Sequence, residues 1–421
     1  MPTRTIICLV LLALAALAAP TAAQEPFGDA LQPSRGDAVS RRFLPPRFDD
    51  SAQLTPLILS IPRAPQPVRA TDGRFHLVYE LQMLNFGAFP ATPSPTPAAL
   101  EVVEVALFVA SSSAPLLVLD GDALLQRMQL LRLAPSPATT ELEVGQSGVL
   151  YLDVTFPDRQ SVPRRISNRV TVRAIPGTGE QPVVDTTSLE VAIDPKPVVV
   201  VGPFLRGGPW INANGCCDFA SPHRRVGRAV NGKEFWPERF AVDLLKAELV
   251  GGELKVCTGD CGQLGDWFST GEDILAVADG IVTRVVTGQA NNPIGLTPFP
   301  PVVSTGAGNA VLLAIGDGIF TMYGHMLPGT VSVRVGDRVR RGDVLGKLGN
   351  TGQSTAPHLH FQVMDDNSIG GAEGLPWVLD SFVLVGTFDA LAEDGTVAGI
   401  TPIESARRLE LPLQQTLIRL P

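Results

Sequence analysis

The chain has 421 residues, of which 45% are hydrophobic and 6% are aromatic, and its formal net charge is −9. This length allows two or three domains with a sizeable core, and the hydrophobic content excludes wholesale disorder. The acidic balance argues against a nucleic-acid partner, since a general nucleic-acid binder needs a basic surface to meet phosphates. Abundant Gly and Pro without a period favour many turns and short strands.

Residues 1–23 have the pattern of a secretory signal peptide, in which Arg4 precedes a short apolar run and small residues end at Ala23. A membrane anchor is the alternative, but the apolar run is short and ends in Ala and Pro. No later stretch reaches the roughly 18–20 apolar residues of a spanning helix. We therefore expect an exported chain, periplasmic or extracellular, without a transmembrane segment after cleavage, and a polar linker at residues 24–50.

Residues 51–197 alternate short runs of β-branched residues with turn clusters. This alternation predicts an antiparallel β-sandwich of immunoglobulin-like type, with one short helix within residues 120–131. The segment contains a single histidine, His76, and neither a cluster of carboxylates nor a Gly-rich loop. We therefore expect an accessory binding or spacer domain without chemistry of its own.

Beyond a boundary near residues 195–203, Trp and His appear and Gly becomes dense, while the strand-like periodicity continues. Residues 198–390 are predicted to form a second, antiparallel β-sheet domain, so that the whole chain is all-β. Its hairpins are expected at Asp-Gly, Gly-Asp-Gly and Arg-Gly-Asp turns. Residues 391–421 are assigned as a C-terminal tail.

Four cysteines remain after signal cleavage, namely Cys216, Cys217, Cys257 and Cys261. A zinc site of four thiolates would suit a reducing compartment, whereas two disulfides suit an oxidising one. Because adjacent cysteines rarely bond to each other, we expect each residue of the first pair to reach one of the second pair. Both cross-connectivities stay open.

The strongest motif is the Gly-rich run 349–361, which contains His358-Leu359-His360. Alternate side chains of a strand share one face, so the two imidazoles would lie side by side, where one binds a metal and the other faces substrate. An exposed histidine pair without function is the alternative. The glycines before the pair allow a backbone loop to pass close to the site.

Two further residues are predicted to join this site. His325 follows Tyr323 and Gly324 at the end of an expected strand, where it supplies a second non-ligand imidazole. Asp243 lies within an otherwise apolar strand, and a carboxylate is costly to bury without a partner. A metal ion would be such a partner.

These motifs, together with YGHM at 323–326 and AVADGIV at 276–282, resemble the lysostaphin/LytM-type zinc metallopeptidases over roughly residues 220–385. The resemblance implies a small β-sheet domain with a groove, Zn²⁺ as cofactor and hydrolysis of peptide bonds in bacterial cell-wall peptidoglycan. It also implies specific roles: zinc ligation by Asp243 and His360, and catalysis by the imidazoles of His325 and His358.

One position departs from the family pattern, in which a histidine ligand stands four residues before the aspartate. Arg239 occupies this position, and a guanidinium does not ligate zinc. Asn231-Gly232 is a strong hairpin signal, and pairing across that turn brings His223 beside Phe240. A one-residue bulge would then turn His223 to the face of Asp243. We therefore predict His223 as the third zinc ligand.

Three protein ligands leave an open position, as catalytic zinc sites require. His325 or His358 would transfer the proton, with the order of their roles open, while Tyr323 and Arg239 would contact substrate. One alternative is a non-catalytic regulator of this family that binds cell wall or a partner hydrolase. Another is a lipoyl- or biotinyl-type carrier domain, but the turn at residues 340–342 lacks the lysine it needs. The sequence gives no oligomeric state.

Overall fold

Strands dominate the structure, as the β-branched runs predict, and the fold is nearly all-β. It is a computed structural model that describes residues 54–87, 98–109, 112–131, 137–175, 184–297 and 305–421. The expected signal peptide and linker lie outside the described residues. Residues 53–421 form one compact unit. The helices of the described residues are short: α1 (Gly121–Leu125), η1 (Pro222–Arg225) and η2 (Leu264–Asp266).

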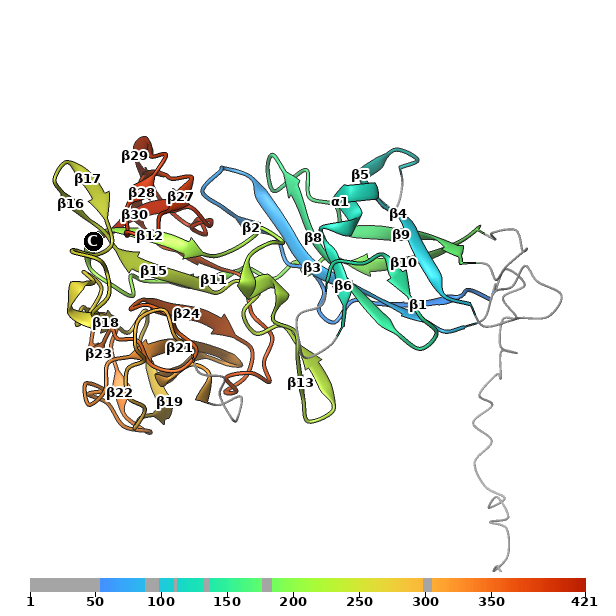
Figure 1. Cartoon of the computed structure of the whole chain (residues 1–421). Coiled ribbons are helices and arrows are strands. Elements are labelled where there is room, and N and C mark those ends of the chain that lie inside the picture. Colours follow the sequence, from blue (N-terminus) through green and yellow to red (C-terminus); the bar gives the residue numbers. More distant parts are fainter. Residues whose placement is uncertain (1–53, 88–97, 110–111, 132–136, 176–183, 298–304) are drawn as a thin grey trace, which may run out of the picture. The chain divides into compact units, whose positions relative to one another are not determined.

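The first half is a sandwich of two antiparallel five-stranded sheets that enclose one hydrophobic core (Figure 1). One sheet contains β1 (Leu57–Ser60), β2 (Val68–Arg69), β3 (Phe75–Asn85), β6 (Met128–Leu130) and β8 (Ser147–Phe156). The other contains β4 (Leu100–Val109), β5 (Pro115–Asp120), β7 (Glu141–Leu142), β9 (Arg165–Ala174) and β10 (Val184–Ala192). The immunoglobulin-like relationship stays a prediction.

A ten-stranded sheet forms the centre of the second half (Figure 1). Its spatial order is β22 (Arg338–Val339), β19 (Gly280–Val286), β20 (Asn309–Gly316), β21 (Ile319–Met326), β24 (Leu359–Met364), β15 (Val242–Lys246), β12 (Gly207–Asn214), β30 (Thr416–Leu420), β26 (Phe382–Thr387) and β29 (Thr401–Arg407). The main core packs against one face of it and includes Val242, Leu244 and Phe361. This core extends to Val68 and Val78 of the sandwich, so the two halves share buried apolar surface.

Five two-stranded sheets complete the described fold. They pair β11 (Val199–Val201) with β25 (Trp377–Leu379), β13 (Arg228–Val230) with β14 (Lys233–Phe235), β16 (Glu248–Val250) with β17 (Glu253–Lys255), β18 (Asp273–Leu275) with β23 (Val344–Lys347), and β27 (Ala390–Leu391) with β28 (Val397–Ala398). The expected Gly-Asp-Gly hairpin is present as β20 and β21. The other two expected hairpins, β18 with β19 and β22 with β23, are wrong. Instead, β18 pairs with β23, and β19 pairs with β22 in the ten-stranded sheet.

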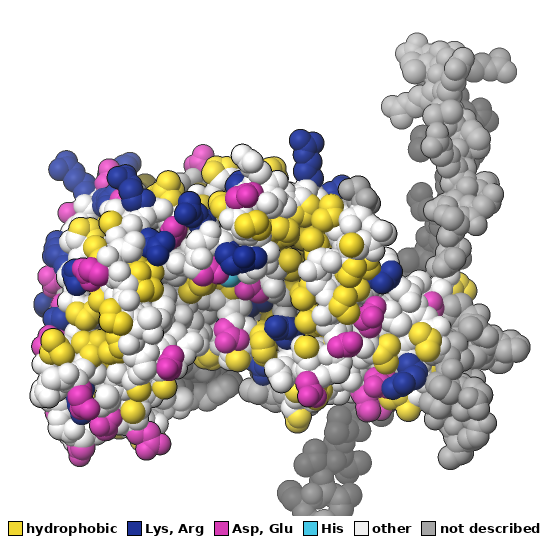
Figure 2. Space-filling model, turned by 90° about the horizontal axis from the view of Figure 1, so that it is seen from above, with side chains coloured by type: hydrophobic (Ala, Val, Ile, Leu, Met, Phe, Trp, Pro, Cys, Tyr) yellow, Lys and Arg dark blue, Asp and Glu magenta, His cyan; other side chains and the backbone are white. Residues whose placement is uncertain are grey.

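Residues 391–421 do not form a separate tail, contrary to expectation. The strand β30 lies between β12 and β26 in the central sheet, where Leu417 and Ile418 are buried. Among the described residues, no helix has both the length and the apolar character needed to cross a membrane. On the face seen in Figure 2, Lys and Arg side chains are mixed with Asp and Glu side chains.

Candidate metal centre

Three adjacent strands of the central sheet carry most of the predicted site. Asp243 on β15 pairs directly with His360 on β24, so the two side chains share one face of the sheet. Their neighbours Leu244 and Leu359 pair on the opposite face, within the core. On the other side of β24, β21 ends at His325 and Met326. The alternation of apolar and polar residues in these strands therefore directs Asp243 and His360 away from the core.

His223 reaches the site from a different element. The hairpin at Asn231-Gly232 forms in the predicted register but ends at the pair Arg228 and Phe235. His223 lies beyond it in the short helix η1, so the predicted bulged strand is wrong. The turn nevertheless brings His223 Nε2 to 3.1 Å from Asp243 Oδ2.

The Asp243 carboxylate is the centre of the cluster, and the side chain is 9% exposed. Its Oδ1 lies 2.9 Å from His360 Nδ1 and 3.3 Å from His358 Nε2, and its Oδ2 accepts a hydrogen bond of 2.8 Å from Asn214 Nδ2. Burial alone would raise the pKa of the Asp243 carboxyl, but the imidazoles of His223 and His358 hold it well below its ordinary value.

Hydrogen bonds outside the cluster orient two of the imidazoles. His223 Nδ1 donates to the Ala241 carbonyl oxygen at 3.3 Å, and His360 Nε2 donates to Gln362 Oε1 at 2.8 Å. The other nitrogen of each ring therefore faces Asp243. One nitrogen of each ring and a carboxylate oxygen of Asp243 lie within 4.8 Å of one another. Rings held in this way are typical of histidines that ligate a metal, since the outer hydrogen bond fixes the tautomer and the ring orientation.

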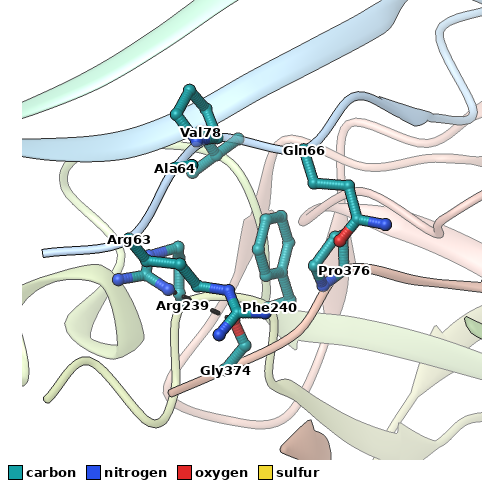
Figure 3. Close-up of a pocket in the computed structure, with 9 residues that line it drawn as sticks. Arg63, Ala64, Gln66, Val78, Arg239, Phe240, Gly374 and Pro376 are labelled. Carbon is teal, nitrogen blue, oxygen red and sulfur yellow. Dashed lines mark hydrogen bonds between the residues drawn. The ribbon is translucent and has the colours of Figure 1, made fainter. Parts of the chain in front are cut away.

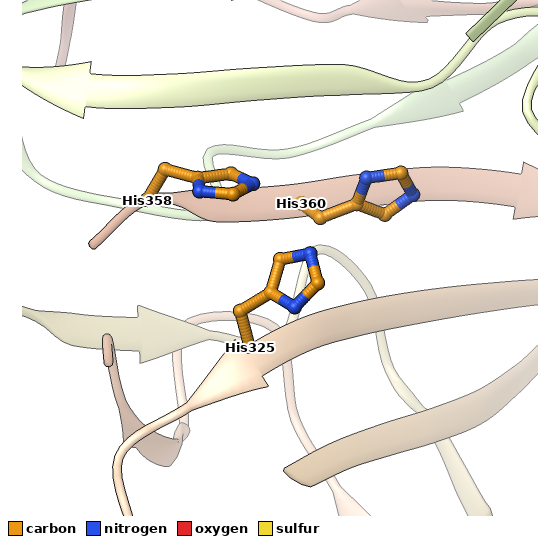
Figure 4. Close-up of side chains that lie close together, drawn as sticks. All are labelled: His325, His358 and His360. Carbon is orange, nitrogen blue, oxygen red and sulfur yellow. The ribbon is translucent and has the colours of Figure 1, made fainter. Parts of the chain in front are cut away.

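The remaining two imidazoles lie beside this group (Figure 4). The ring centroids of His325 and His358 are 4.6 Å apart, and His325, His358 and His360 form a second close group of nitrogens. His325 Nδ1 donates to the Thr351 carbonyl at 2.7 Å, and His358 Nδ1 donates to the Ala356 carbonyl at 2.8 Å. In both rings, Nε2 is therefore the nitrogen that makes no hydrogen bond to a backbone carbonyl.

His325 is held in an unusual state by its surroundings. Burial, with His358 and His360 nearby, keeps the pKa of His325 well below its ordinary value, so its ring is neutral. Its φ of 60° is in the left-handed region, which few residues other than Gly adopt. Residues in this region concentrate at functional sites.

The Gly-rich loop before the histidine pair packs as closely as predicted. Gly352 has a φ of +75°, and a Cβ there would clash with the backbone of Gly308. This close approach places Thr351, whose carbonyl accepts the hydrogen bond from His325.

Tyr323 is not placed to contact substrate, contrary to the prediction. Its side chain is fully buried in the core, and its hydroxyl accepts a hydrogen bond of 3.0 Å from the Val277 backbone N–H. Burial raises the pKa of Tyr323 above its ordinary value. The tyrosine therefore supports the sheet beneath the cluster.

Arg239 is also a structural residue, because its guanidinium is 3% exposed and forms ion pairs on two sides. Its Nε donates to Glu80 Oε2 at 2.8 Å, and its Nη2 donates to Glu373 Oε2 at 2.7 Å. Its Nη1 donates to the Gly374 carbonyl, as Figure 3 shows. The predicted contact of Arg239 with substrate is therefore wrong.

The cysteines pair locally, and the predicted cross-connections are wrong. The sulfur atoms of Cys216 and Cys217 are at bonding distance from each other, as are those of Cys257 and Cys261. The two pairs belong to different hydrophobic clusters, which is why they do not join.

Sequence reasoning missed the residues that surround the cluster. Gln362 follows His360 by two positions on the same strand, so strand alternation would have placed it on the same face. No sequence signal pointed to Asn214, or to Glu80 and Glu373, because their partners are distant in the chain.

Comparisons with known proteins relate part of this chain to a family of peptidases. Residues 266–369 match the model of peptidase family M23. The glycyl-glycine endopeptidase ALE-1 of Staphylococcus capitis is 45% identical over 103 residues, which are 24% of each chain. Lysostaphin of Staphylococcus simulans is 46% identical over 59 residues, 14% of this chain and 12% of lysostaphin. The chain thus matches about a quarter or less of these relatives' length.

Among solved structures, the catalytic domain of lysostaphin from Staphylococcus simulans is 22% identical, with a TM-score of 0.21. The likeness covers 41% of this chain and 86% of that domain. The matched family segment contains three of the cluster's histidines, whereas His223 and Asp243 precede it. Because they match the family model, residues 266–369 of this chain are a peptidase family M23 domain.

Proposed function

We propose that this protein is an exported zinc metallo-endopeptidase that hydrolyses peptide bonds of bacterial cell-wall peptidoglycan. In this proposal, His223, Asp243 and His360 hold the zinc ion, and His325 and His358 transfer protons. One observation carries it: two ring nitrogens and a carboxylate oxygen converge within 4.8 Å, beside two further imidazoles.

The donor set fits a catalytic zinc ion. Two histidines and one carboxylate are a common ligand set, and three protein ligands leave a position open. The hydrogen bonds to Ala241 and Gln362 match the outer contacts of zinc-ligating histidines. When bound there, zinc polarises the scissile carbonyl and lowers the pKa of a water molecule.

The proton chemistry belongs to His325 and His358. Each ring donates its Nδ1 hydrogen to a backbone carbonyl, so Nε2 is the nitrogen that accepts and returns a proton. One imidazole takes the proton from the attacking water and delivers it to the leaving amine, while the other stabilises the developing oxyanion. His358 is the more accessible of the two rings, since its side chain is 12% exposed.

The names of the relatives support the substrate class. The glycyl-glycine endopeptidase and lysostaphin match the domain, as does the peptidoglycan DD-endopeptidase ShyA of Vibrio cholerae, which is 40% identical over 58 residues, 14% of this chain and 13% of ShyA. Export agrees with the expected signal peptide and with cysteines paired as disulfides.

Zinc content and hydrolysis together test the proposal. The purified mature chain is expected to hold one zinc ion per molecule and to release new amino termini from isolated peptidoglycan. A chain that binds peptidoglycan without stoichiometric zinc and without releasing amino termini would instead be a non-catalytic regulator, for which the arginine at position 239 is the supporting observation.

A further inference from the structure

A buried carboxylate of the sandwich contacts both chain segments that lead to the proposed ligands. Glu80 lies on β3 and is 1% exposed. Its Oε1 accepts a hydrogen bond of 2.9 Å from Arg224 Nη1, and its Oε2 accepts one of 2.8 Å from Arg239 Nε. Arg224 directly follows His223, and Arg239 precedes Asp243 by four residues. Glu80 therefore links the turn that carries one ligand to the start of the strand that carries another.

Arg224 fixes the turn to the sandwich through several contacts. The residue is fully buried, and its Nη2 donates to the carbonyls of Tyr79 and Leu152 on β3 and β8, at 3.4 and 3.3 Å. Its guanidinium also lies 5.6 Å from the ring centroid of Tyr151. A guanidinium stays charged at any physiological pH, so its burial requires a carboxylate, and Glu80 is the one it contacts.

The segment around His223 has little support of its own. The helix η1 has four residues, and β13 and β14 have three each, so none of them forms an independent core. The segment instead packs on the sandwich, where Trp236 joins a cluster with Val149 and Tyr151 of β8. Arg225 Nη2 adds a hydrogen bond of 2.9 Å to the Gln126 carbonyl.

We propose that Glu80 is a positioning residue of the zinc site, and that the sandwich thereby completes the metal centre of the peptidase domain. By holding Arg224 and Arg239 together, Glu80 fixes His223 Nε2 at its short distance from Asp243. Arg239, four residues before Asp243, serves this contact between the two halves through its hydrogen bond to Glu80. The inference rests on the proposed zinc function.

Zinc affinity of the full chain tests the inference. Zinc is titrated into the metal-free wild type and into Glu80→Gln, in competition with a chromophoric chelator. Glu80→Gln keeps the side-chain shape but removes the charge that balances the two arginines. Mutation of residues that support metal ligands usually lowers metal affinity by about 10- to 100-fold, and we expect Glu80→Gln to bind zinc more weakly than the wild type by that factor.

A matched control separates positioning from general stability. Val105 is fully buried on β4, in the other sheet of the sandwich, and Val105→Ala leaves a cavity there without touching the turn. This variant is expected to unfold more easily and to bind zinc as the wild type does. Wild-type affinity in Glu80→Gln, or equal weakening in both variants, would overturn the inference.

Two other outcomes are also decisive. If Glu80→Gln does not fold, Glu80→Asp keeps the negative charge between the two arginines but draws the carboxylate back from them by one methylene, and its zinc affinity is measured against the same control. Weakened binding in this folded variant supports the positioning role, and unchanged binding overturns it. A wild type that binds no zinc would refute the proposed function itself, and the inference with it.

Discussion

Replacing Arg239 by alanine should unfold the protein far more easily, because this guanidinium joins two buried carboxylates. Its Nη2 lies 2.7 Å from Glu80 Oε2 and 2.7 Å from Glu373 Oε2, and its Nη1 donates to the Gly374 carbonyl. Arg239→Ala leaves Glu373 without a cation in a buried position. Breaking a buried ion pair from one side costs about 3–5 kcal/mol, out of a total of roughly 5–15 kcal/mol for a typical domain.

Urea unfolding of the full chain, followed by tryptophan fluorescence, measures this loss. A matched control is Arg419→Ala, since Arg419 pairs with Glu404 at the surface, where both side chains are about half exposed. Surface pairs contribute about 0–1 kcal/mol, so this control should unfold almost as the wild type does. If the two alanine variants unfold at the same urea concentration, the buried pair stabilises the protein no more than the surface pair does.

The pH dependence of the same variant adds a second test. Burial raises the pKa of Glu373 above its ordinary value, although Arg239 opposes the shift. Without Arg239 that pKa rises further, so the contribution of Glu373 to the stability of Arg239→Ala is greatest below the ordinary pKa of 4.5 and is lost as pH rises through the raised pKa. The gap between wild type and variant should therefore be smaller in mild acid than at neutral pH.

Three further variants test the cluster and the sandwich. His223→Ala should abolish stoichiometric zinc binding while the far-ultraviolet circular dichroism stays unchanged, and full zinc retention would exclude His223 as a ligand. His358→Ala should keep zinc, measured by elemental analysis, and lose about 10²–10⁴-fold in turnover, the usual share of a general acid or base. The pKa of His76 is about 9, because hydrogen bonds to Asp153 and Asp72 outweigh burial. Its stabilisation is full below pH 6.5 and is lost as pH rises through 9, by at most about 3 kcal/mol. His76→Gln should remove this slope from urea unfolding measured across that range, and an unchanged slope would contradict the assignment.

The strand-borne part of the site could be predicted from sequence because strand alternation is a local rule. Asp243 stands between the apolar Val242 and Leu244, and His358 and His360 are two residues apart. In the structure, Val242 and Leu244 pack in the core, and Asp243 meets His360 on the other face. A period of two residues is thus enough to predict which side chains leave the core together.

The turn brings His223 beside Asp243, as expected, but through a short helix and not through the predicted bulged strand. The Asn231-Gly232 hairpin has the predicted register from Arg228 to Phe235, since two-residue turns fix the register next to them. Beyond that point the chain leaves the ladder, and Pro222 begins a short helix. The sequence could not show this, because the packing of the turn depends on the sandwich strands β3 and β8.

Contacts between distant parts of the chain were beyond sequence reasoning. Glu80 and Arg239 are 159 residues apart, and a single sequence gives no sign that they meet. The same holds for β30, which inserts between β12 and β26 although residues 391–421 have little periodicity. The cysteine prediction failed for a related reason, because the two pairs are buried in separate clusters.

A metal ion requires ligand atoms at particular points in space, whatever the spacing of the residues in the chain. Backbone hydrogen bonds between the strands hold Asp243 and His360 in place. His223 lies in η1, whose position depends on contacts with the surrounding residues. In the proposed site the ligand His223 lies on this turn, so position 239 is free for a residue of another kind, and an arginine there contacts the sandwich. The position of a ligand on such a turn depends on the surface against which the turn packs. The accessory sandwich is therefore expected to determine zinc affinity, although it offers no ligand to the proposed site.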